Sequence, residues 1–187
     1  MFGLYILLFG IFLALLEIEI EGEHGWAKNL PTWRKVKSNA PIGFLRNMTG
    51  YHTILNLMIL SLNHIFFIGL YGNRWIVGEL FIFAFSAFLI IYWDFLWFIL
   101  NPHFTTKKFE KEHIPWYTDS LWIAGFPIDY WYGAGASLAL ALIGYSMTTS
   151  GNLMEEYMLT LAVGLLVWCI TFFASPLYHA WYHFMRR

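Results

Sequence analysis

The feature that most constrains this chain is the length of its apolar stretches, five of which are about as long as the roughly 20 residues that a helix needs to cross a bilayer. Hydrophobic residues make up 59% of the sequence and charged residues only 12%, against about 25% charged in soluble domains. The sequence therefore predicts an all-α polytopic integral membrane protein with about five transmembrane helices in one domain. The expected spans are 2–20, 53–70, 75–100, 128–147 and 153–174.

The basic residues set the expected orientation of these spans. With five spans, ten of the eleven Lys and Arg residues fall on one side of the membrane and only Arg74 falls on the other. Because basic residues concentrate in cytoplasmic loops, we expect the N-terminus outside and the C-terminus in the cytoplasm of a plasma (inner) membrane. The chain lacks a basic surface interleaved with aromatic residues, so nucleic acid is not an expected partner.

Several smaller patterns predict how the helices begin and pack. Ser175 and Pro176 read as the N-cap and first residue of a fresh or kinked helix, so an interfacial helix is expected at about 176–187. All six prolines are expected outside the spans. A small-residue stripe in the fourth span indicates close helix packing; it consists of Gly133, Ser137, Ala141 and Gly144. His64 and Glu79, on neighbouring antiparallel helices, are expected to form a hydrogen bond, with a proton pathway as the alternative.

Ionisable residues gather at the predicted cytoplasmic face. The first span ends in a run that holds four glutamates and His24, and six of the seven histidines lie on this side. Asp94 lies about two turns inside the third span, where a carboxylate costs about 2.5–3.5 kcal/mol on insertion scales. Such groups near lipid must be paired, protonated or bound to a metal.

The spacing of these residues resembles that of metal ligands. Glu17, Glu21 and His24 share one face of a helix because they are separated by four and three residues. Glu21 to His24 and Glu110 to His113 both have the Glu-x-x-His spacing by which di-iron helix bundles present ligands. A solvated helix end and a coincidental match in a charged loop are the alternatives for these two pairs.

Two further histidines lie one helical turn apart near the end of the chain, in the pattern His179-x-x-x-His183, as in metal-binding helices. They stand among aromatic residues, so an interfacial aromatic belt is the alternative. His52 and His179 could also serve as axial ligands of a haem. The full set of candidate metal ligands is Glu17, Glu21, His24, His52, Asp94, His103, His113, His179 and His183.

A mixed shell of oxygen and nitrogen atoms suits iron, manganese or zinc. The sequence therefore predicts a metal-dependent membrane enzyme acting on a lipid or other hydrophobic substrate, with Glu17 and Asp94 as catalytic groups. Di-iron oxidation and zinc-activated hydrolysis are the two chemistries that such a site supports. The competing interpretation is a non-catalytic membrane protein, either an accessory subunit or a small transporter.

Overall fold

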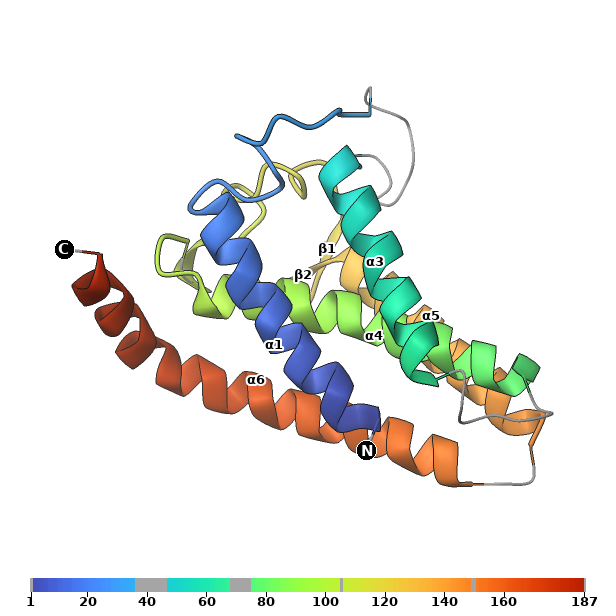
Figure 1. Cartoon of the computed structure of the whole chain (residues 1–187). Coiled ribbons are helices and arrows are strands. Elements are labelled where there is room, and N and C mark those ends of the chain that lie inside the picture. The colour runs from blue at the N-terminus through green and yellow to red at the C-terminus, as the bar shows by residue number, and fades with distance from the viewer. Residues whose placement is uncertain (1, 36–46, 68–74, 105, 149–150, 187) are drawn as a thin grey trace.

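The computed structural model describes residues 2–35, 47–67, 75–104, 106–148 and 151–186. This part of the chain is mostly helical (Figure 1). The α-helices are α1 (Phe2–Glu21), α3 (Gly50–Phe67), α4 (Trp75–Leu100), α5 (Ile128–Ser146) and α6 (Asn152–Met185). The remaining elements are a 3-10 turn, η1 (Thr106–Lys108), and a hairpin of β1 (Trp122–Ile123) and β2 (Phe126–Pro127), which the sequence did not predict.

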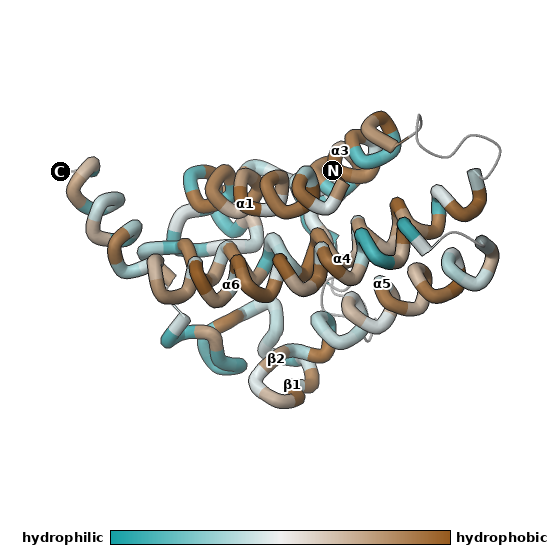
Figure 2. The backbone as a smooth tube through the Cα atoms, turned by 90° about the horizontal axis from the view of Figure 1, so that it is seen from below, coloured by the Kyte–Doolittle hydropathy of each residue, from teal (hydrophilic) through white to brown (hydrophobic). Residues whose placement is uncertain are grey.

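Within the described residues, three helices are long and apolar enough to cross a membrane, namely α1, α4 and α6. Apolar residues run along all three (Figure 2). The expected spans at 53–70 and 128–147 correspond to α3 and α5, which are long enough but less hydrophobic than the other three helices. Polar residues such as Asn63 in α3 and Asp129 in α5 lower their hydropathy. Positions 68–70 of the second expected span lie outside the described residues, as do four basic residues used for orientation, namely Lys37, Arg46, Arg74 and Arg187.

Helix α4 is the centre of the fold, because each of the other four α-helices packs against it. Its buried side chains include Tyr92 and Leu89, both fully inaccessible. Gly10 of α1 lies against the ring of Tyr92, so closely that an added Cβ would lie 2.6 Å from a ring carbon. Small residues at such crossings let helix backbones approach in a membrane protein.

The small-residue stripe of α5 faces the bundle as expected. Ser137, Ala141 and Gly144 are buried, and Gly133 lies against Ile91 of α4. The Ser137 hydroxyl lies 2.7 Å from the carbonyl oxygen of Ala84, to which it donates a hydrogen bond. The stripe therefore holds α5 on α4, along one wall of the cavity described below.

The expected hydrogen bond between α3 and α4 is confirmed: His64 Nε2 and Glu79 Oε2 are 2.9 Å apart. His64 Nδ1 also lies 2.6 Å from the carbonyl oxygen of Leu60. Both side chains of the pair are partly exposed. This contact joins the C-terminal part of α3 to the N-terminal part of α4.

Helix α6 runs through Pro176 without interruption, so the expectation that every proline lies outside the long helices is wrong for this residue. The predicted kink is present as a bend in the C-terminal part of α6 (Figures 1 and 2). Proline lacks the N–H that would bond the carbonyl of Phe172. The Ser175 hydroxyl donates to that carbonyl instead, at 2.9 Å, and so satisfies the freed acceptor.

Candidate functional site

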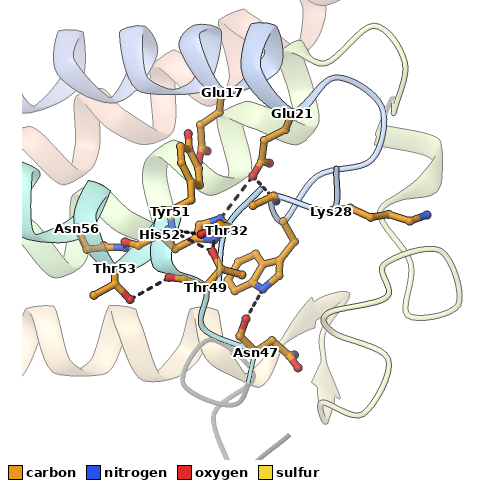
Figure 3. A network of polar contacts seen from close by, with 12 residues as sticks. Glu17, Glu21, Lys28, Thr32, Asn47, Thr49, Tyr51, His52, Thr53 and Asn56 are labelled. Atoms are coloured by element: carbon orange, nitrogen blue, oxygen red, sulfur yellow. Dashed lines mark hydrogen bonds and ion pairs between the residues drawn. The ribbon is translucent and has the colours of Figure 1, made fainter. Parts of the chain in front are cut away.

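Side chains from two distant segments meet where α1 ends and α3 begins (Figure 3). Glu17 and Glu21 lie one turn apart on α1, and His52 lies in the first turn of α3. One ligand atom of each lies within 4.8 Å of the ligand atoms of the other two. We call these three residues the Glu–Glu–His group.

The geometry of this group matches the spacing of atoms around an ion. His52 Nε2 and Glu21 Oε1 are 3.6 Å apart, which is too far for a direct hydrogen bond. Two ligand atoms that each lie about 2.0–2.2 Å from one metal are separated by roughly 3–4 Å. The His52–Glu21 distance is in this range, and the three residues could hold a divalent metal.

His52 is held by its own helix start. Its Nδ1 shares a hydrogen bond of 2.7 Å with the Thr49 hydroxyl, which also accepts the backbone N–H of His52 at 3.3 Å. The indole of Trp26 stacks on the imidazole at a centroid distance of 4.3 Å. Burial lowers the pKa of His52 to about 4, so the ring is neutral near pH 7, as a metal ligand must be.

Glu17 is the most deeply buried acidic residue of the group, at 6% exposure. Trp93 Nε1 donates to its Oε2 at 2.6 Å, whereas its Oε1 is buried and has no hydrogen-bond partner among the described residues. The buried hydroxyl of Tyr51 also makes no hydrogen bond of full geometry to a described residue, but its ring extends towards Glu17 (Figure 3) and the hydroxyl interacts with the Glu17 carboxylate. A buried carboxylate oxygen without a partner is costly and would be satisfied by a cation or a proton.

Glu21 connects the group to the loop that follows α1. Its Oε1 accepts the backbone N–H of Ala27 at 2.5 Å. The loop turns sharply there, because Trp26 and Ala27 have positive φ angles of 49° and 52°. The Arg34 guanidinium donates to the carbonyls of Trp26, Ala27 and Lys28 and so fixes the turn. This turn brings Trp26 onto His52.

A cavity of about 490 Å³ adjoins the Glu–Glu–His group. Helix α4 contributes Asp94 and Trp97 to its lining, and the loop before α5 contributes Trp116 and Tyr117. Asp94 accepts hydrogen bonds from the hydroxyls of Tyr130 and of Tyr117, the latter at 3.4 Å. Burial and the nearby Asp94 carboxylate raise the pKa of Tyr117, so its hydroxyl stays protonated and donates.

The structure does not bring the other candidate histidines into the Glu–Glu–His group. Helix α1 ends at Glu21, and Gly22 has a φ of 62°, so the helical relation expected between Glu21 and His24 is absent. His24 pairs with Glu23 instead, at 3.5 Å. His113 pairs with Glu110 at 3.7 Å in an exposed loop.

His103, His179 and His183 gather at a separate place, where α6 passes the end of α4. The rings of His103 and His183 have centroids 5.9 Å apart. His179 Nε2 lies 3.2 Å and 3.1 Å from the carbonyl oxygens of Ile99 and Leu100. A donor in this position satisfies carbonyls at the C-terminus of α4. None of the three lines the cavity beside Glu17.

Sequence reasoning placed Glu17, Glu21, His52 and Asp94 among the candidates but missed the side chains that support them. Thr49, Tyr51, Tyr117 and Tyr130 carry no motif by which they could have been found. Trp93 and Trp97 could be found, because they flank Asp94 in a predicted span, where they are compatible with a shaped pocket or with a lipid-facing belt. No protein-family model, curated protein or solved structure matches this chain.

Proposed function

We propose that this chain is a membrane-embedded, metal-dependent enzyme that acts on a lipid or other hydrophobic substrate. The observation that carries the proposal is the Glu–Glu–His group, with a buried and unpartnered carboxylate oxygen on Glu17 beside a cavity. Two carboxylates and one neutral imidazole suit iron, manganese or zinc. Three protein ligands leave a position open for water or substrate, as in catalytic metal sites.

In the proposed site, a metal and the Asp94 carboxylate have different chemical roles. A bound metal would supply Lewis acidity or an activated water in hydrolysis, or a redox centre in oxidation. Asp94 is assigned as the acid–base group, because it lines the same cavity and is held by two tyrosine hydroxyls. The carboxylate can accept a proton from a group in the cavity, and the tyrosines orient it.

The proposal includes the finer topology of five spans, with the N-terminus outside a plasma (inner) membrane. Supporting it, the C-terminal ends of α1, α4 and α6 lie towards the same side as the N-terminal ends of α3 and α5 (Figure 1). In this arrangement α3 and α5 are the less hydrophobic spans, and the metal lies near the cytoplasmic face, where the polar ends of lipids are found.

Elemental analysis tests the metal directly. The chain is purified in detergent without chelators or a polyhistidine tag, and its iron, manganese and zinc are measured by mass spectrometry. We expect stoichiometric metal that is lost in Glu17→Gln and in His52→Ala. The matched controls are Glu110→Gln and His113→Ala, an exposed Glu–His pair that also has its atoms close together.

Three results would overturn the proposal. Metal that persists in Glu17→Gln and His52→Ala would place the ligands elsewhere. A preparation that takes up no iron, manganese or zinc when these are supplied would favour the non-catalytic membrane protein. A Soret band in the absorption spectrum would identify haem instead.

A further inference from the structure

The cavity beside the Glu–Glu–His group has a polar end and an apolar end. The polar end holds Glu17, Glu21, His52 and Asp94. The apolar end is lined by Ala87, Ile90 and Ile91 of α4 and by Gly133 and Ala136 of α5. Ala87 precedes Asp94 by two helical turns, or about 10 Å along the axis. It is therefore close to the middle of α4, one of the helices long enough to cross a membrane.

The polar end contains two donors without acceptors. The indole nitrogens Trp97 Nε1 and Trp116 Nε1 are buried and have no hydrogen-bond partner among the described residues, and both rings line the cavity. Buried indole N–H groups normally find an acceptor. Together with Glu17 Oε1, they leave two donors and one acceptor unsatisfied in the wall of this end, where a small rotation of the side chain is needed to turn each atom towards an occupant.

The charge of the lining restricts what can satisfy these groups. Four carboxylates line the cavity, from Glu17, Glu21, Asp94 and Asp129, and none of the described lining residues is Lys or Arg. An anionic head, such as a phosphate or a sulfate, would meet these four like charges, of which the proposed divalent metal would offset only two. An alkylammonium head carries no acceptor for the two indole N–H groups. An uncharged hydroxyl or carbonyl oxygen is not repelled by the carboxylates and can accept hydrogen bonds from the indole N–H groups.

The cavity is also accessible from the side of the bundle. Tyr132 and Ala136 line it from α5, yet both side chains are exposed on the outside of the protein. A cavity bordered by such residues can admit a molecule laterally from a bilayer. Its volume of about 490 Å³ lies within the range of small-molecule sites, roughly 300–1,000 Å³.

We infer that the cavity binds an amphipathic molecule with an uncharged, oxygen-bearing head and an apolar chain, such as a long-chain alcohol, aldehyde or ester. As the substrate class of the enzyme, this inference rests on the proposed function. The head lies against the indole rings of Trp97 and Trp116, beside the Glu–Glu–His group, and accepts their N–H groups once the rings turn towards it. The chain lies along Ala87, Ile91 and Ala136, towards the middle of the membrane.

Photo-crosslinking tests this inference. Three probes share one alkyl chain with a diazirine near its end and differ only in the head, which is a hydroxyl, a trimethylammonium or a sulfate. The chain is reconstituted in lipid nanodiscs, and labelled residues are mapped by mass spectrometry. We expect the hydroxyl probe to label residues 87–91 and 133–136, and the two charged probes to label them much less.

Matched variants separate the cavity from the surrounding surface. Ala136→Trp fills the apolar end and is expected to abolish labelling, whereas Ala134→Trp, on the same helix and exposed but outside the cavity lining, leaves it unchanged. Trp97→Phe keeps an aromatic ring but removes the N–H. It should weaken binding of the hydroxyl probe by about 2- to 10-fold, the effect of one hydrogen bond.

The results also distinguish this inference from the proposed metal site, because metal content is measured on the same samples. Equal or stronger labelling by a charged probe, or equal labelling of Ala136→Trp and Ala134→Trp, overturns the inference even when metal is bound. Labelling as expected in a chain that binds no metal supports the ligand class and overturns metal-dependent catalysis.

Discussion

Replacing Glu17 by glutamine should affect stability differently with and without metal. Glutamine has the same shape and keeps an acceptor for Trp93 Nε1, which now lies 2.6 Å from Glu17 Oε2. At a pH where Glu17 is ionised in the metal-free chain, the substitution removes a negative charge whose second oxygen is buried without a hydrogen-bond partner among the described residues. Relief of one such group is worth about 1–3 kcal/mol. In the presence of chelator we therefore expect Glu17→Gln to be more stable than the parent chain.

Metal should reduce this difference and, unless the variant's advantage is at the upper end of its range, reverse it. A ligand at about 100 times its dissociation constant stabilises the native state by about 2.7 kcal/mol, and only the parent chain should gain this. For a chain of 187 residues, each kcal/mol shifts Tm by about 2–4 °C. The chelated variant should thus melt about 2–12 °C above the chelated parent, and added metal should raise the Tm of the parent by about 5–11 °C.

Thermal unfolding in detergent, followed by tryptophan fluorescence with chelator and with each metal, measures both effects. Glu110→Gln is the control, because this exposed carboxylate should change stability by no more than about 0.5 kcal/mol in either condition. If Glu17→Gln melts below the parent chain in the presence of chelator, the Glu17 carboxylate already has a partner in the metal-free parent. An equal response of both chains to metal would show that Glu17 is not a ligand.

Three further predictions concern the fold. Ser175→Ala should lower the free energy of unfolding by about 0.5–1.5 kcal/mol, measured by thermal unfolding. In a Pro176→Ala background it should cost almost nothing, because the new backbone N–H bonds the Phe172 carbonyl in place of the hydroxyl. Equal costs in both backgrounds would contradict the role of Ser175. Burial lowers the pKa of His103, so the unfolded chain binds the proton more tightly than the folded chain. The free energy of unfolding should therefore fall as the pH drops below about 6.5. In a series of Tm values against pH, His103→Gln should reduce the dependence of Tm on pH in this range. Gly10→Ala should destabilise by about 1–3 kcal/mol through overpacking, whereas Gly135→Ala, with open space around its Cβ position, should gain up to about 1 kcal/mol in helix propensity.

Much of the helical framework follows from local sequence. The third expected span matches α4 at both ends, and the first and fourth differ from α1 and α5 by a single residue. Apolar run length and the absence of interior proline were sufficient for these elements. The two less hydrophobic helices differ from the other three for a reason visible in the sequence, because α3 contains Asn56, Asn63 and His64 and α5 begins with an acidic residue in its first turn.

The candidate site could be predicted only in part. The four-residue spacing of Glu17 and Glu21 places them on one helix face, and this holds because both precede the end of α1. His24 follows that end, so the same argument did not extend to it. His52 reaches the group through a loop whose described residues include four with positive φ angles, from Gly22 to Ala27, and through an isolated bridge between Arg34 and Thr49. No periodicity in the sequence indicates such a path.

The carboxylate of Glu21 has two roles: it belongs to the Glu–Glu–His group, and it holds the loop that follows α1. Its Oε1 holds the backbone of Ala27, and through this turn it keeps the Trp26 ring over His52 at the rim of the cavity. A bound cation that shifts this carboxylate would also shift the turn at Ala27, and with it the Trp26 ring. The occupant and the Trp26 ring are thus coupled through the position of one carboxylate, and by linkage each alters the binding free energy of the other.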